Sequence, residues 1–135
     1  MTTPSTNQHW LALTAEAPLE PDLPICDPHH HLWDMRPTRV SERYLLDGFG
    51  WHERARPPTS TELTEATRAF YEFTLEKFGV DRCMFESNFP VDKVTCSYVV
   101  LWNSFKRLTA GYSAAEKAKL FHDTAARVYR LDNFP

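Results

Sequence analysis

The chain has 135 residues, of which 42% are hydrophobic and 24% charged, and its net charge is −3 at pH 7. This length suits one globular domain and is too short for a complete (β/α)8 barrel, which takes about 250 residues. The charge balance leaves no basic stripe for phosphate groups, so the sequence predicts no nucleic-acid partner.

Residues 1–22 are rich in proline and polar side chains, and we expect them to form a flexible N-terminal arm. Residues 23–27 (LPICD) are a short apolar run that predicts a buried strand, with residues 28–33 as its end and exit loop. Residues 34–58 contain several prolines and glycines and few periodic signals. This composition predicts mostly loop.

Residues 59–78 carry apolar side chains at helical spacing and predict an amphipathic helix. Thr59 and Glu62 fit a capping box at its start, and Gly79 suits a stop just past its end. Residues 82–86 (RCMFE) predict a second short strand, which the following Asn-Phe-Pro sequence ends.

Two further helices are predicted over residues 97–110 and 113–130. The second opens with a Ser113/Glu116 capping box and carries an apolar stripe. The predicted order is therefore loop–β–loop–α–β–α–α, and this alternation favours the α/β class.

The strongest chemical feature is the segment DPHHHLWD, residues 27–34. In an extended backbone His29 and His31 point to the same side, where two imidazoles can share a metal such as zinc or manganese. Asp27 lies on that side too, as a ligand or as the acceptor for an imidazole N–H. A polar surface turn is the alternative, because two histidines do not complete a metal site.

A second candidate segment is FESNFPVDK, residues 85–93, which follows the second predicted strand. Asn88 offers an amide oxygen and an NH2 group but cannot serve as a general base. Glu86, Asp92 and Lys93 could supply acid–base or charge interactions. The alternative is a solvated loop with incidental charges.

The three cysteines are widely spaced and form no CxxC motif, as is typical of reduced thiols in cytosolic proteins. The first residues lack the charged and apolar regions of a signal peptide. No apolar run approaches the roughly 18–20 residues of a membrane span. We therefore expect a cytoplasmic protein without a membrane partner.

ICDPHHHLWD resembles the first-strand metal motif of the amidohydrolase-related (amidohydrolase 2) family, which contains lactone hydrolases and metal-dependent decarboxylases. The stretch from FGVDRCMFESNFPVDK to EKAKLFHDTAARVYRL resembles the end of the same family's domain. GFGWHERARPP resembles the segment just before the last strand. The likeness covers residues 23–46 and 48–131.

The resemblance implies a (β/α)8 barrel with a divalent metal, zinc or manganese, at its carboxyl-terminal mouth. His29 and His31 match the two histidines of the family's HxH pair, and Asn88 matches a position where many members have an acidic residue. Because both end motifs occur in a chain about half the length of a barrel, we expect an internal deletion near residues 46–49. The fold implied is a partial TIM-type α/β barrel, with the first strand, the last strand and the closing helices, as one truncated domain over residues 23–135.

The function implied is a metal-dependent, lactonase-like hydrolysis of a small-molecule substrate, namely a cyclic ester (lactone), an amide or a carboxylate. Asn88 would then position water or substrate. The alternative is a non-catalytic truncated remnant that self-associates as a homo-oligomer, or binds a paralogue, through exposed apolar faces. A metal-binding module without any reaction is the third interpretation.

Overall fold

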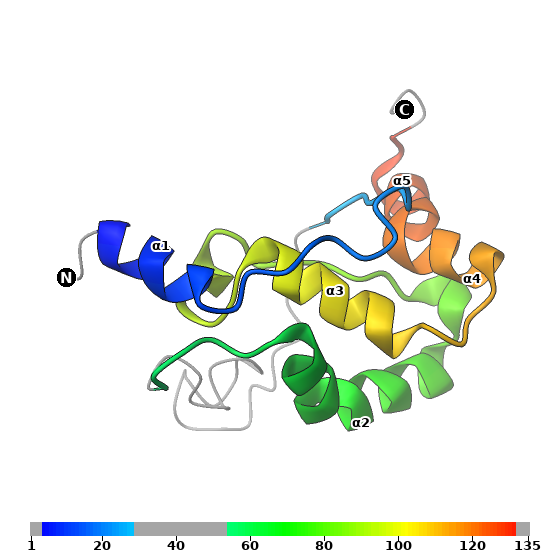
Figure 1. Ribbon diagram of the computed structural model, residues 1–135. Helices are drawn as coiled ribbons and strands as arrows, with labels where there is room; N and C mark the ends of the chain where they lie inside the picture. Colours follow the sequence, from blue (N-terminus) through cyan, green and yellow to red (C-terminus); the bar gives the residue numbers. More distant parts are fainter. Residues whose placement is uncertain (1–3, 29–53, 132–135) are drawn as a thin grey trace, which may run out of the picture.

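The computed structural model describes residues 4–28 and 54–131, with the backbone alone for residues 4–7. Helix α3 lies in the middle, α2 runs along one side of it, and α4 and α5 lie toward the other side (Figure 1). The helical elements in chain order are α1 (Pro4–Ala12), α2 (Ser60–Phe78), the 3₁₀ turns η4 (Val80–Arg82) and η5 (Val91–Val94), α3 (Tyr98–Leu108), α4 (Ala114–Ala118), the π-helix η6 (Lys119–Asp123) and α5 (Thr124–Tyr129).

Helix α2 begins as its sequence predicts. The Thr59 hydroxyl accepts a hydrogen bond from the Glu62 N–H at 3.2 Å, and the Glu62 carboxylate accepts one from the Thr59 N–H at 2.8 Å. Two hydrogen bonds from the Arg56 guanidinium, helped by those from Thr59, lower the pKa of Glu62 to about 2. The chain leaves the helix at Gly79 with a φ of +75°, which L side chains rarely adopt. The predicted helix and its capping box are confirmed.

The hydrophobic core is an aromatic cluster centred on Phe105 of α3. Its ring stacks on Phe85 with 4.4 Å between centroids. The rings of Tyr71 and Trp102 meet it edge-on at 5.4 and 5.6 Å. Phe121 of η6, which is fully buried, adds a further contact to Phe85 at 5.1 Å. Residues from α2, α3, η6 and the irregular segments around Ile25 and Phe85 therefore share a single core.

The helix predicted over residues 113–130 is present, and its Ser113/Glu116 capping box is confirmed. Its middle turn widens into the π-helix η6 before α5 resumes an α-helical course. Two carbonyls of η6 accept hydrogen bonds from elsewhere in the chain. Cys26 N–H donates to the Phe121 carbonyl, and Phe85 N–H donates to the Leu120 carbonyl, each at 2.8 Å.

The prediction of an α/β fold, a partial (β/α)8 barrel, is wrong for the described part of the chain. Neither residues 4–28 nor residues 54–131 contain a strand, and the regular structure there is helical. The two segments predicted as strands contain Cys26 and Phe85. Their N–H groups bond to the carbonyls of η6 instead of to a neighbouring strand, so no sheet ladder forms between them.

The segment predicted as a flexible arm contains helix α1, and the chain after α1 runs along α3 (Figure 1). Asn103 of α3 accepts a hydrogen bond from the Leu19 N–H at 2.8 Å, and the Lys106 ammonium donates to the Leu19 carbonyl. Burial lowers the pKa of Lys106. The domain limits at residues 22 and 23 stay a prediction, as does the junction near residues 46–49, which lies outside the described residues. No helix in the described ranges is long and apolar enough to cross a membrane.

Candidate functional site

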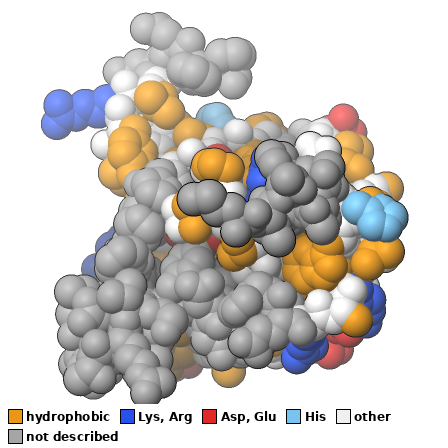
Figure 2. All heavy atoms as spheres, turned by 90° about the vertical axis from the view of Figure 1, so that its left-hand side faces the viewer, with side chains coloured by type: hydrophobic (Ala, Val, Ile, Leu, Met, Phe, Trp, Pro, Cys, Tyr) orange, Lys and Arg blue, Asp and Glu red, His pale blue; other side chains and the backbone are white. Residues whose placement is uncertain are grey.

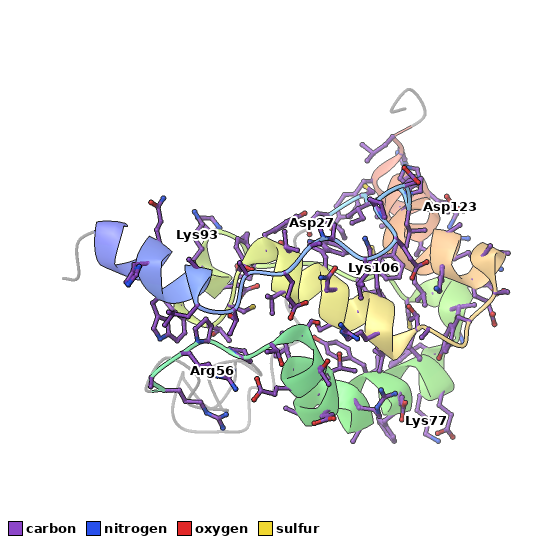
Figure 3. All side chains as sticks on the ribbon, in the orientation of Figure 1. Asp27, Arg56, Lys77, Lys93, Lys106 and Asp123 are labelled. Carbon is purple, nitrogen blue, oxygen red and sulfur yellow. The ribbon has the colours of Figure 1, made fainter. Side chains whose placement is uncertain are left out.

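Two segments that are distant in sequence meet at Asp27, which is labelled in Figure 3. Its Oδ1 accepts a hydrogen bond from the backbone N–H of Ser87 at 2.7 Å, and its Oδ2 accepts one from the Ser87 hydroxyl at 2.5 Å. Ser87 is buried, whereas Asp27 is exposed. The contact joins the segment that leads into the histidine motif to the segment that contains Asn88.

Tyr98, in the first turn of α3, also contacts Asp27. Its hydroxyl donates a hydrogen bond to Oδ2 of Asp27 at 3.0 Å. Burial, followed by the negative charge of Asp27, raises the pKa of Tyr98 to about 12. The phenol therefore keeps its proton at neutral pH and acts as a donor to the carboxylate.

Asn88 is held through its backbone. Its N–H donates a hydrogen bond to Oδ2 of Asp92 at 2.9 Å, and its carbonyl accepts one from the Asp92 N–H at 3.1 Å. Asp92 is buried, with 2% of its surface exposed, and begins the turn η5 with Val91. Burial, with the nearby Asp92 charge, raises the pKa of Cys96 to about 12, so this thiol stays protonated. The Asn88 side chain is half-buried beside Ser87.

Glu86 and Lys93, the other two charged residues of the second candidate segment, have different surroundings. Glu86 is half-buried and helps to raise the pKa of Tyr71, for which burial is the main cause. Lys93 is exposed and lies toward α1, apart from Asp27 (Figure 3). The structure thus brings Asp27, Ser87 and Tyr98 together with the backbone of Asn88.

The predicted metal ligands His29 and His31 lie outside the described residues, and their role stays a prediction. In the described ranges, no group of three or more His, Cys, Asp or Glu side chains could hold a metal ion. Asp27 nevertheless fits a zinc or manganese site next to two imidazoles, because a carboxylate can serve there as a ligand or as an acceptor for a ligand's N–H. A complete site requires the histidines.

Sequence reasoning identified Asp27 and Asn88 as candidates and missed Ser87 and Tyr98. Ser87 immediately precedes Asn88, so its position in the motif was a usable signal. Tyr98 follows the helix N-cap Ser97 and had no comparable signal, because its contact with Asp27 spans 71 residues.

The sequence profile of the family described as Amidohydrolase matches residues 48–131. A protein of Sinorhizobium fredii (strain NBRC 101917 / NGR234), named "Uncharacterized protein y4mH", is 52% identical over 68 residues. These residues are 50% of this chain and 23% of that protein, so the match spans about a quarter of the relative's length. No solved structure matches the chain.

The family match begins at residue 48 and covers more than half of the chain, including Asn88 and every helix from α2 to α5. Amidohydrolases are hydrolases that generally use a divalent metal. Sequence motifs and the family match agree over residues 48–131, and the chain belongs to the amidohydrolase family.

Proposed function

We propose that this chain is a metal-dependent hydrolase that acts on a small cyclic ester (lactone), an amide or a carboxylate. The observation that carries the proposal is the pair of hydrogen bonds between Asp27 and Ser87, 60 residues apart. Asp27 precedes the histidine motif by two residues, and Ser87 directly precedes Asn88. The bonds therefore support a site to which both motifs contribute.

In this proposal His29 and His31 hold a zinc or manganese ion, which when bound would polarise a water or a carbonyl oxygen. Asn88 positions water or substrate, because an amide both donates and accepts hydrogen bonds but takes up no proton near neutral pH. Its hydrogen-bonded backbone limits the positions that this side chain can reach.

Isothermal titration with zinc chloride, and then with manganese chloride, tests the metal site in the whole chain. We expect stoichiometric binding by the wild-type protein, loss of binding in His29→Ala and His31→Ala, and metal-stimulated turnover in a panel of simple lactones. His122→Ala is the matched control, because His122 lies in η6 and bonds to the neighbouring Asp123. Metal binding that survives both substitutions in the motif would refute the proposed ligands.

A second candidate function, a non-catalytic remnant that self-associates, is favoured by the outer surface of α2. Phe70 and Phe73 are 41% and 60% exposed, and Lys77 lies over the Phe73 ring at 5.4 Å. Other hydrophobic side chains reach the surface on the left-hand side of the molecule as drawn in Figure 1, which Figure 2 turns toward the viewer. Large exposed apolar side chains that gather on one face are typical of protein interfaces.

Sedimentation velocity over a dilution series tests this second candidate. We expect a concentration-dependent dimer in the wild-type protein, and a shift toward the monomer when Phe70 and Phe73 are both replaced by serine. Val128→Ser provides the control, since Val128 is similarly exposed, at 53%, but lies on α5. A wild-type protein that sediments as a monomer at every concentration would rule out self-association.

A further inference from the structure

Helix α2 carries apolar side chains on its outward face as well as on the face that packs against α3. It lies at the lower edge of the molecule in Figure 1, with α3 above it. The buried residues of α2 include several hydroxyl groups and are Ser60, Leu63, Thr64, Thr67 and Leu75. Two alanines and two phenylalanines form an exposed row at helical spacing, here called the outer stripe: Ala66, Ala69, Phe70 and Phe73. An apolar row of this kind is typical of a helix face that is covered by a partner.

The orientation of α2 is fixed by contacts on its inner face. The Arg107 guanidinium of α3 donates a hydrogen bond to the Ser60 hydroxyl at 2.7 Å. The ring of Tyr71 meets that of Phe105 edge-on at 5.4 Å. Turning α2 to bury the outer stripe would break both contacts. The stripe is therefore available to a partner without any rearrangement of the core.

The outer stripe is complementary in size to a second copy of itself. Its two small residues precede its two large ones along the helix. Suppose that a second α2 lies antiparallel across the first, about a two-fold axis that passes between positions 69 and 70. Ala66 then lies opposite Phe73, and Ala69 lies opposite Phe70, so that each ring meets a position where the two backbones can approach closely. A parallel copy would instead set ring against ring and alanine against alanine.

The charges at the two ends of the stripe favour the same arrangement. Glu62 lies one turn before Ala66 on this side of the helix, and Lys77 lies one turn after Phe73, with its ammonium over the Phe73 ring at 5.4 Å. The antiparallel copy brings Glu62 opposite Lys77 at both ends, whereas a parallel copy would bring like charges together. Such exposed pairs add little affinity, but they select the orientation.

We propose that α2 forms a two-fold symmetric dimer contact, in which the outer stripes of two copies of this chain pack antiparallel with Ala66 of each copy against Phe73 of the other. This inference rests on the second candidate function, self-association, and assigns to it the partner surface and its register. A standard stable interface buries about 1,600 Å², more than one helix packed on one helix provides. The dimer is therefore expected to be weak and to dissociate on dilution.

An exchange of side-chain size between positions 66 and 73 tests the register by sedimentation velocity. We expect Ala66→Phe to raise the dissociation constant of the dimer at least tenfold, because the added ring occupies the place of the partner's Phe73 and the symmetry repeats this clash. The double substitution Ala66→Phe/Phe73→Ala exchanges the two sizes and should restore the constant to within about threefold of the wild-type value. Ala115→Phe is the matched control, since it makes the same substitution at an exposed position of α4 and should leave the constant unchanged.

The outcomes separate this inference from the second candidate function. If the wild-type chain dimerises and Ala66→Phe dimerises equally well, the antiparallel register is refuted and self-association stands. A double substitution that stays as weak as Ala66→Phe refutes the pairing of position 66 with position 73. If the wild-type chain is a monomer at every concentration, self-association itself fails, and the outer stripe would have to be covered by a different partner.

Discussion

Phe105→Ala is expected to lower the free energy of unfolding by about 3–5 kcal/mol, the cost typical of truncating a buried phenylalanine. Phe105 is 2% exposed and stacks on Phe85. Tyr71 on α2 and Trp102 on α3 contact its ring from other directions. Because these neighbours belong to different elements, they cannot all move into the space that the ring vacates. A domain of this size is stable by about 5–15 kcal/mol, so the loss is a large fraction of the total.

Urea-induced unfolding followed by far-UV circular dichroism measures this effect. Phe78→Ala is the matched control, because Phe78 ends α2 with 57% of its surface exposed and its truncation should stay within about 0.5 kcal/mol. Phe105→Leu should fall between the two, since leucine refills part of the space. Equal stability of Phe105→Ala and Phe78→Ala would show that the aromatic cluster is not the core of the folded chain.

The helices were predictable because their signals are local. The Thr59/Glu62 and Ser113/Glu116 capping boxes each join residues three apart, and both form as the sequence predicts. The pattern failed to show one detail, the π-helical turn η6 in the middle of the last predicted helix. That turn carries the carbonyls that accept from Cys26 and Phe85, so it depends on contacts far along the chain.

The strands were mispredicted because a strand forms only where its backbone groups pair with those of a neighbouring strand. An apolar run such as residues 82–86 indicates burial, and Phe85 is indeed 4% exposed. The run does not indicate which other segment will accept hydrogen bonds from its N–H groups. In the structure the N–H groups of Cys26 and Phe85 donate to carbonyls of the π-helix η6. The two segments are therefore irregular, although Phe85 is buried as its apolar run indicates.

The candidate site was predictable only in part for a similar reason. Asp27 stood out because it precedes the histidine motif, and Asn88 because of the motif around it. Their connection through Ser87 depends on a contact between residues 60 apart, which no spacing rule reveals. His29 and His31 remain predicted from the motif alone.

Asn103→Ala is expected to detach residues 14–20 from α3, at a cost of about 2–4 kcal/mol in docking free energy. Asn103 is 1% exposed; its Oδ1 accepts from the Leu19 N–H, and its Nδ2 donates to the Ala17 carbonyl, each at 2.8 Å. A further bond of 3.1 Å reaches the Glu16 carboxylate, which also accepts from the Ser60 N–H at the start of α2. Alanine leaves two backbone groups of part-buried hydrogen bonds without their partner, and each such group costs about 1–2 kcal/mol.

Hydrogen exchange followed by mass spectrometry measures the detachment directly. Because about 1.4 kcal/mol corresponds to a factor of ten, the amides of residues 14–20 should exchange at least tenfold faster in Asn103→Ala. Asn103→Asp tests the donor: it keeps an acceptor for the Leu19 N–H but sets a buried carboxylate against the Ala17 carbonyl and the Glu16 carboxylate, so exchange at least as fast as in Asn103→Ala is expected. Exchange that is already fast in the wild-type protein, and unchanged by either substitution, would mean that the segment is the flexible arm its composition predicts and that the contacts of Asn103 contribute little to holding it.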